Sequence, residues 1–575
     1  MVTWLSSVQN GNYRNGVSRT VPSGRSTHSS ELFNWWATIN FCPSVKRIGG
    51  AFIFLPDRPE HQARTEPTAM SLTAAEIEKI VSTDENNSST LLVPRRELRR
   101  MLEALGACEF KARRAPPLAK LCSAGADYGW SELERGVGSK LIGQNSAKAR
   151  ASLRRHLRKT LERITRPCLD LEWKSFKLAT SALGLATSDA TVIERMFLRD
   201  RPGDRLALLF EKFPVLARLW CLTIRQWRDY VAEVLKRLAD DRPVVGDFFF
   251  GKQVADTVAD MRPGLSDPHH GGRSVTLIEF SLGRRVIYKP RSGKSESTWF
   301  SLLSWMNQHG FQPRLKTARV LAREGYSWME YVEPASCESE AGVRRFYERM
   351  GGLIAAAYLL KAVDCHRENV IAAGEYPVLV DIDALWHVSP LTKTQTPVDV
   401  LYRTGFFPNS RPASLQSRSS VLGRSKTGKH LARIAGRPVV AALYTNEIIA
   451  GFSRAWNCIL GTPGRRAAFL RIVQRVRSQR RRWIYRATEG YGAVLQASVQ
   501  PGLLRSTATR QELITRSCRG RAPTRAVAET EINALTRLDL PYFVRKTNHT
   551  MPRDKNSVPS ELTEAIRSVL EPSKT

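Results

Sequence analysis

Regular hydrophobic patterning begins near residue 95, where apolar residues recur at helical spacing. In the stretch KARASLRRHLRKTLERITRP, apolar positions are four, four and three residues apart, with Arg and Lys between them. This spacing makes one buried stripe on an amphipathic helix, formed by Leu153, Leu157, Leu161 and Ile164. A second helical stretch, FPVLARLWCLTIRQWRDYVAEVLKRLADD, ends near Asp241. The pattern therefore predicts a helical subdomain over residues 93–250.

The pattern changes at about residue 265, where short β-rich runs replace the helical stripes. SVTLIEF and RRVIYKP flank the turn Ser-Leu-Gly, which predicts a hairpin. A helix over SESTWFSLLSWMNQHG stops at Gly310, and the strand-like GYSWMEYVE follows. The helix FYERMGGLIAAAYLLKAV leads to DCHREN and then to a strand, YPVLVDID. After about residue 390 the pattern predicts a mostly helical, very basic chain, as in RIVQRVRSQRRRWIYR.

These changes in hydrophobic pattern and composition divide the chain into five segments. The first is rich in Ser, Asn, Gly and Pro, which predicts a poorly ordered or atypical N-terminal region. The first segment covers residues 1–92, and the second is the helical subdomain, 93–250. The third, 251–390, is a mixed core with the candidate site. The fourth, 391–550, is helical and basic, and the fifth, 551–575, is a C-terminal tail. The mixture predicts an α+β fold.

Composition narrows the class of protein. The 575 residues are 42% hydrophobic, which is enough for a large core. None of the nine Cys lies in a CxxC pair, so neither a disulfide framework nor a zinc ribbon is indicated. No basic start followed by an apolar run opens the chain, and runs such as LIAAAYLL are too short to cross a bilayer. We therefore expect a cytoplasmic protein with no membrane span.

The net charge of +34 favours acidic partners, such as nucleic acid, an anionic membrane or an acidic peptide. The excess is mostly Arg spread along the chain, so charge alone selects none of them. RVRSQRRRWIYR interleaves Arg with aromatic residues, as in proteins that grip phosphates and stack bases. An exposed helix face explains these residues more simply, so we do not expect nucleic acid as a partner.

The motif DCHREN carries the first candidate chemistry. Asp364 and Asn369 are five residues apart, and Asp381 follows at a strand end. Protein kinases place a loop Asp near the substrate hydroxyl, an Asn five residues later on a metal, and a strand-borne Asp on a metal. They also need an upstream strand Lys for the ATP phosphates, and Lys289 in VIYKPR fits that position. The order of these elements predicts a nucleotide-dependent phosphotransferase.

A second cluster, SDPHHGGRSV, precedes the lysine strand. The backbone amides of Gly271 and Gly272 could cradle a phosphate before the hairpin. The alternatives are an ordinary Gly-rich turn with exposed His, or a metal site formed by Asp267, His269 and His270.

These motifs, together with GYSWMEYVE, the stretch from FYERMGG to VDIDAL, and LDLPYF, resemble the dehydratase domain of type II lanthionine synthetases, the LanM family. The resemblance extends over roughly residues 95 to 545, and its most specific part is 264–390. It implies a lipid-kinase-like core with extra helical subdomains. It also implies an enzyme that uses ATP and Mg²⁺ to phosphorylate Ser and Thr of a precursor peptide. Elimination of the phosphate then gives dehydroalanine or dehydrobutyrine.

The resemblance assigns roles by position. Lys289 becomes the phosphate-binding lysine, and Asp364 becomes the catalytic-loop acid with His366 beside the reacting group. Its metal ligands fall on Asn369, Asp381 and Asp383, where the last position more often holds Glu in the family. A family GDxH element implicated in activity falls on Asp267 and His269, with Ser266 in place of its Gly.

The family's elimination motif is an Arg, then Arg-x-Thr with its Thr six positions after that first Arg, and usually a Tyr shortly afterwards. We place it on LLRSTATRQEL, where Arg505 and Thr507 supply the Arg-x-Thr. The first Arg then falls on Pro501 and the Tyr position on Arg510. Because proline cannot neutralise a leaving phosphate, elimination would require Arg505 or Arg510 to substitute. The alternative for this segment is a basic helix end or loop.

Family members usually continue into a cyclase domain with a Cys/His zinc site, and no such signature follows LDLPYF. We therefore expect a dehydratase without cyclase activity, acting on a precursor peptide with a leader and a Ser/Thr-rich core. A separate cyclase would be a further partner. The alternative is a truncated, inactive LanM-like fragment that binds a peptide or a partner.

Overall fold

The computed structural model describes residues 46–48, 51–53, 74–82, 93–106, 116–184, 190–198, 202–251, 257–387, 396–408, 420–423, 427–546 and 558–571. Of the predicted segment 1–92, only the short pair β1 (Lys46–Ile48) and β2 (Ala51–Ile53) and helix α2 (Ala74–Ser82) are described. The rest of that prediction lies outside the described residues.

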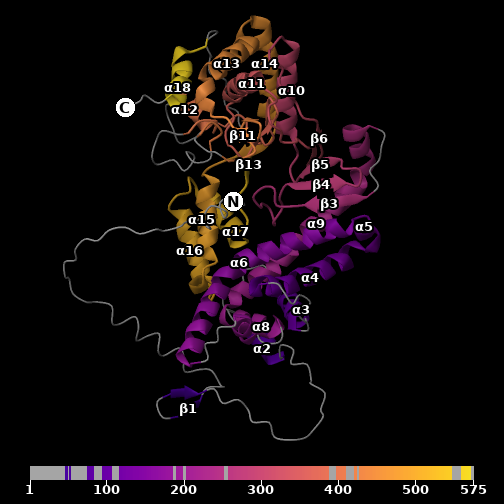
Figure 1. The fold of residues 1–575 in the computed structure, drawn as a ribbon, viewed down its shortest axis with the longest axis vertical. Helices are drawn as coiled ribbons and strands as arrows, with labels where there is room; N and C mark the ends of the chain where they lie inside the picture. Colours follow the sequence, from indigo (N-terminus) through magenta and orange to yellow (C-terminus); the bar gives the residue numbers. More distant parts are fainter. Residues whose placement is uncertain are drawn as a thin grey trace, which may run out of the picture.

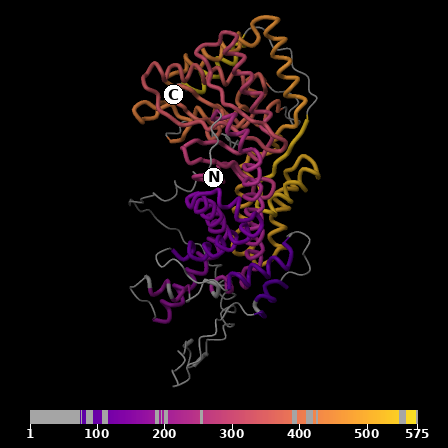
Figure 2. Tube along the Cα trace, turned by 90° about the vertical axis from the view of Figure 1, so that its right-hand side faces the viewer, coloured from indigo at the N-terminus to yellow at the C-terminus, as the bar shows by residue number. Residues whose placement is uncertain are grey.

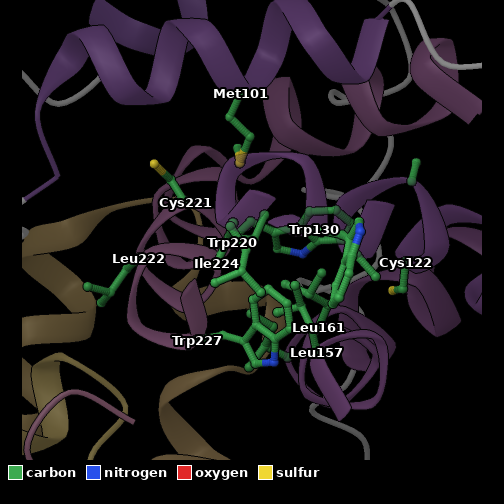
Figure 3. Close-up of a cluster of buried hydrophobic side chains, with 14 of the residues drawn as sticks. Met101, Cys122, Trp130, Leu157, Leu161, Trp220, Cys221, Leu222, Ile224 and Trp227 are labelled. Carbon is green, nitrogen blue, oxygen red and sulfur yellow. The ribbon is translucent and has the colours of Figure 1, made fainter. Parts of the chain in front are cut away.

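A bundle of helices forms the lower part of the molecule in Figure 1. Its elements are α3 (Arg95–Gly106), α4 (Pro117–Val137), α5 (Ser139–Gly143), α6 (Ala147–Ala182), α7 (Ala190–Leu198), α8 (Pro202–Lys212) and α9 (Pro214–Phe250). The predicted stripe on α6 is confirmed, because all four of its apolar residues are buried. Leu157 and Leu161 meet Trp130, Trp220 and Trp227 in the core of this bundle (Figure 3).

A five-stranded antiparallel sheet follows the bundle, in the order β3-β4-β5-β7-β6. Its strands are β3 (Val258–Arg262), β4 (Thr276–Phe280), β5 (Arg285–Lys289), β6 (Val320–Ala322) and β7 (Ser327–Glu330). The predicted hairpin is confirmed by the pairing of β4 with β5, and β5 also pairs with β7. This places the lysine strand in the middle of the sheet. Helix α10 (Lys294–Gln308) follows β5 and ends just before Gly310, as predicted.

The upper part of Figure 1 has its own core, built mainly by α10, α11, α13 and α14. Its elements are α11 (Glu340–Leu359), β8 (Val370–Ala373), β9 (Tyr376–Leu379), α12 (Pro397–Arg403), β10 (Arg433–Ile434), β11 (Arg437–Pro438), η3 (Ala441–Tyr444), α13 (Thr445–Leu460), α14 (Pro463–Ser478) and α18 (Ser560–Leu570). The predicted C-terminal tail therefore contributes a helix, and Leu562 and Ile566 of α18 are buried in this core. The loop carrying DCHREN joins α11 to the hairpin of β8 and β9.

Helices α15 (Thr488–Ser498), α16 (Thr507–Arg519) and α17 (Arg525–Thr536) form a third, small core, and the short helix η4 (Pro501–Leu503) joins α15 to α16. They stand beside the two larger parts, as the yellow trace in Figure 2 shows. The prediction of a helix through RIVQRVRSQRRRWIYR is wrong in its second half. Helix α14 ends at Ser478, and Arg481–Trp483 is strand β12, which pairs with β13 (Phe543–Arg545).

The observed mixture of many helices and a small sheet fits the predicted α+β class. Within the described part of the chain, no helix combines the length and apolarity that crossing a membrane would require.

Candidate active site

The centre of the candidate site is a buried ion pair between the sheet and the helix that follows it. Lys289, at the end of β5, is 3% exposed and donates to Glu296 Oε1 at 3.0 Å and to the Val380 carbonyl at 2.5 Å. Glu296 lies in the first turn of α10 and is 1% exposed. A Lys on the third strand of a sheet, paired with a Glu of the next helix, is the arrangement that kinases use to hold ATP phosphates. Sequence reasoning missed Glu296, although an acid opening the helix after a lysine strand was a usable signal.

Arg291 links this pair to the two acids that follow β9. Its guanidinium contacts Glu296 at 3.3 Å and Asp383 at 3.5 Å, and it also forms an ion pair with Asp381. Burial opposes ionisation of Asp381, but Arg291 and Lys289 outweigh it and hold the pKa of Asp381 below its ordinary value. For Asp383 burial prevails over Arg291 and Arg482, and its pKa is raised. The two carboxylates thus have unequal affinities for a proton although they are only two residues apart.

The DCHREN loop brings Asp364 and Asn369 together through the backbone. Asp364 has a φ of +68°, which Asp tolerates better than most residues, and its carbonyl accepts a hydrogen bond from Asn369 Nδ2 at 2.8 Å. The Val380 amide donates to the Asn369 carbonyl at 2.8 Å, which ties the loop to the strand before Asp381. His366 Nδ1 accepts a hydrogen bond from the Glu368 amide at 3.2 Å, so Nε2 carries the proton when the ring is neutral. This Nε2 lies 3.4 Å from Asp364 Oδ1.

The residues assigned to Mg²⁺ have suitable donor chemistry. Because Asn369 gives its nitrogen to Asp364, its amide oxygen is the atom left for a cation, and Asp381 and Asp383 add carboxylate oxygens. A bound cation would compete with Arg291, which pairs with both carboxylates. Among the described residues, no three His, Cys, Asp or Glu side chains gather at metal-binding distance. The metal assignment therefore stays a prediction.

The glycine pair of SDPHHGG holds an internal carboxylate. The amides of Gly271 and Gly272 donate to Asp539 Oδ2 at 2.6 Å and Oδ1 at 2.8 Å. Both glycines have positive φ, of +88° and +77°, which points the two amides in one direction. The two amides thus bind an internal anion, Asp539 of the LDLPYF segment (residues 538–543), and their assignment to a phosphate stays a prediction.

His269 in the same loop is fixed by that segment. Its Nδ1 donates to the Leu540 carbonyl at 2.8 Å, so Nε2 keeps a lone pair for accepting a proton. Burial, together with the nearby charge of Arg482, lowers the pKa of His269 to about 3. The neighbouring Asp267 has a raised pKa because it is largely buried. The loop therefore presents a neutral imidazole whose lone pair is on Nε2.

Arg482, on β12, is the arginine that reaches the DCHREN loop. Its Nη1 lies 3.2 Å from Asp364 Oδ2 and 3.7 Å from Asp383 Oδ1. Burial disfavours its charge, but Asp383 and Asp364 outweigh burial and raise the pKa of Arg482. The prediction of an exposed helix face for this segment is wrong here, because strand β12 turns Arg482 into the site.

The spacing of the elimination motif is met in full by the residues that begin with Arg482. Arg486-Ala-Thr488 places a Thr six positions after Arg482, and Tyr491 follows shortly after. One small pocket is lined by side chains that include those of Arg482, Arg486, Thr488, Tyr491 and His269. The motif therefore fits this segment better than it fits LLRSTATRQEL, where Pro501 and Arg510 occupy two of its positions.

This pocket has its own buried support. Glu531 of α17 is fully buried; it pairs with Arg486 at 2.5 Å and accepts from the Tyr491 hydroxyl at 2.6 Å. Arg486 also donates to the carbonyls of Ser517 and Cys518 near the end of α16. The guanidinium of Arg486 is thus held by protein groups, whereas Arg482 faces the acids of the DCHREN loop.

Two comparisons with known proteins bear on the family of this chain. A family model described as "Domain of unknown function (DUF4135)" matches residues 213–430 and 419–546, which is more than half of the chain. The chain belongs to this family. It is also 23% identical over 392 residues to the lacticin 481/lactococcin biosynthesis protein LcnDR2 of Lactococcus lactis subsp. lactis. The two matches confirm the LanM-like character that the motifs indicated. The second covers 59% of this chain and 41% of that relative, so the chain spans less than half of the relative's length.

In this LanM-like chain, the residues first assigned to elimination lie elsewhere. Arg505 is exposed and stacks on Phe213, at the start of α9, at 6.0 Å. Thr507 is the first residue of α16, and Pro501 opens the short helix η4. Arg510 is 2% exposed and donates to the carbonyls of Ser498, Leu535 and Thr536, and burial lowers its pKa to about 10. Arg510 therefore ties α15, α16 and α17 together.

Proposed function

We propose that this LanM-like chain takes part in lantibiotic biosynthesis as an ATP-dependent peptide dehydratase. It would phosphorylate Ser and Thr of a ribosomally made precursor peptide, and then eliminate the phosphate to leave dehydroalanine or dehydrobutyrine. The observation that carries the proposal is the buried Lys289–Glu296 pair, which joins the DCHREN loop and Asp381 through Val380 and Arg291. A lipid-kinase-like core is part of the same proposal, supported by the position of the lysine on the central strand.

In the first step, the Ser or Thr oxygen attacks the γ-phosphorus of ATP, and ADP leaves. Asp364 orients the hydroxyl and accepts its proton, and Lys289 binds the phosphates. Mg²⁺, held by Asn369, Asp381 and Asp383, would neutralise the phosphate charge. This step is mostly positioning and charge compensation, which suits a site of fixed ion pairs.

In the second step, a base removes the α-proton, the Cα=Cβ bond forms, and the Cβ–O bond breaks to release phosphate. His269 would be the base, since its Nδ1 donates to the Leu540 carbonyl and leaves the lone pair on Nε2. Arg482 suits the cation for the leaving phosphate, since its charge is kept by Asp364 and Asp383. On this assignment, elimination would not require Arg505 or Arg510 to take the place of an arginine at Pro501.

The test is incubation of the full chain with precursor peptides from its own gene neighbourhood, ATP and Mg²⁺, followed by mass spectrometry. Loss of water from the peptide supports both steps, and gain of phosphate without loss of water supports the first alone. Lys289→Met and Asp364→Ala should abolish both products. Lys294→Met changes an exposed lysine at the first position of α10, five residues after Lys289, and should retain them. An unmodified peptide together with intact peptide binding would favour the inactive-fragment alternative.

The proposed partners follow from this activity. They are a precursor peptide with a leader and a Ser/Thr-rich core, and a separate cyclase that would close lanthionine rings. The lack of cyclase activity, the separate cyclase and the cytoplasmic location remain predictions. Incubating the dehydrated peptide with this chain and titrating its free thiols tests the first, because ring closure would consume them.

A further inference from the structure

The LDLPYF segment enters the steps above only through the Leu540 carbonyl, yet it is anchored at both ends in the site. Asp539 binds the amides of Gly271 and Gly272, and the Leu540 amide donates to the Pro268 carbonyl at 2.9 Å. Immediately beyond it, Phe543 opens β13, which pairs with the strand that carries Arg482. The backbone around Tyr542 is therefore held by two different parts of the site.

Tyr542 projects from this anchored backbone to Asp383. Its hydroxyl donates to Asp383 Oδ2 at 3.2 Å, across 159 residues of sequence. The His269 ring packs edge-on against the phenol ring, with centroids 5.1 Å apart, and the Arg482 guanidinium lies 5.5 Å from its centroid. A side chain with two rotatable bonds, packed in this way, keeps its hydroxyl at one place.

The other contacts of Asp383 are of a different kind. Arg291 and Arg482 approach its carboxylate at 3.5 and 3.7 Å, and both cations can transfer to phosphate when a nucleotide or phosphopeptide is bound. A phenol hydroxyl is neutral, so it orients the carboxylate without cancelling the negative charge that a cation site needs. It also leaves lone pairs of the carboxylate for a metal ion.

We propose that Tyr542 is a positioning residue that holds Asp383 in the orientation needed to bind Mg²⁺ and nucleotide together. The nucleotide site is then complete only when the LDLPYF segment is in place. This inference rests on the proposed function, because it presupposes that Asp383 acts in a nucleotide site.

The test is calorimetric binding of ATP by the full chain, with Mg²⁺ and with chelator. Tyr542→Phe keeps the ring contacts and removes only the hydroxyl. Its Kd for ATP with Mg²⁺ should rise roughly tenfold, the usual effect of losing a hydrogen bond to a charged group. Its Kd in chelator should stay unchanged, which a merely structural defect would not predict. Tyr347→Phe is the matched control, because it loses one hydroxyl bond to the Val439 carbonyl at 2.9 Å, away from the described site.

A double-mutant cycle decides whether Tyr542 acts through Asp383. In an Asp383→Asn background, Tyr542→Phe should change the Kd by less than twofold, and a second tenfold loss would overturn the proposal. If the parent chain binds ATP with Mg²⁺ and the Tyr542→Phe variant has the same Kd, the role of Tyr542 is overturned but the proposed function is not. Parent chain that binds no ATP would overturn the proposed function, and this inference with it.

Discussion

Helices α11 and α13 cross so closely that one added methyl group should separate them. A Cβ on Gly351 would lie 2.0 Å from the Ile448 carbonyl oxygen and 2.7 Å from the Phe452 nitrogen. Both obstacles are backbone atoms, so no change of rotamer can relieve the overlap. The helices would have to move apart by at least about 1 Å, which would loosen the packing along their shared core.

We expect Gly351→Ala to lower the free energy of unfolding by about 2 kcal/mol. Overpacking of a rigid contact costs about 3 kcal/mol, and the better helix propensity of Ala returns at most about 1 kcal/mol. Gly136, near the end of α4, is the control, because it is exposed and a Cβ there would meet nothing within 4 Å. Gly136→Ala should therefore be neutral or stabilising by up to about 1 kcal/mol.

The assay is urea unfolding followed by tryptophan fluorescence, with the three chains compared at one pH. Since α11 leads into the DCHREN loop, Gly351→Ala should also weaken ATP binding. The reasoning is refuted if Gly351→Ala unfolds at the same urea concentration as the parent, or if Gly136→Ala loses as much stability.

Three further predictions concern the site and its surroundings. Arg482→Gln should reduce dehydration of a precursor peptide at least 100-fold by mass spectrometry, whereas Arg505→Gln should keep most of it; the reverse order would restore the first assignment. Burial lowers the pKa of His387 and of His430 to about 4, so the unfolded chain takes up protons that the folded chain resists. The contribution of each neutral histidine to the free energy of unfolding should be fully present above about pH 6.5. It should fall by roughly 3 kcal/mol per histidine as the pH drops to 4. A urea midpoint that does not change over this range would contradict the prediction. Asp539→Ala should destabilise the chain by about 1–3 kcal/mol through two unpaired amides, and added inorganic phosphate should recover part of the thermal midpoint if the loop is an anion cradle.

What the sequence predicted well depends on contacts between near neighbours. The stripe of α6, the β4–β5 hairpin and the end of α10 before Gly310 all follow from periodicity and turn residues within a few positions. The order of Lys289, the DCHREN loop and Asp381 is likewise readable along the chain, and the structure brings them to one place.

What the sequence did not predict depends on distant partners. The arginine run reads as a helix face, and it becomes a strand only because β13 pairs with it some 60 residues later. The hydrogen bond from the Gly271 amide to Asp539 joins residues 268 positions apart, and no local pattern encodes it. The spacing of Arg482 to Thr488 is different, because it is a local pattern that can be read along the chain.

The anchoring of His269 by Leu540, 271 residues later, has a consequence for the order of events during translation. Lys289, Asp364 and Asp381 all emerge from the ribosome well before the segment that completes their surroundings. Contacts over such separations form late, because the intervening chain must first be ordered. A nascent chain would therefore carry an assembled charge cluster but no fixed imidazole and no phenol. Such a chain should be unable to modify a peptide until the LDLPYF segment has been synthesised and has reached the site.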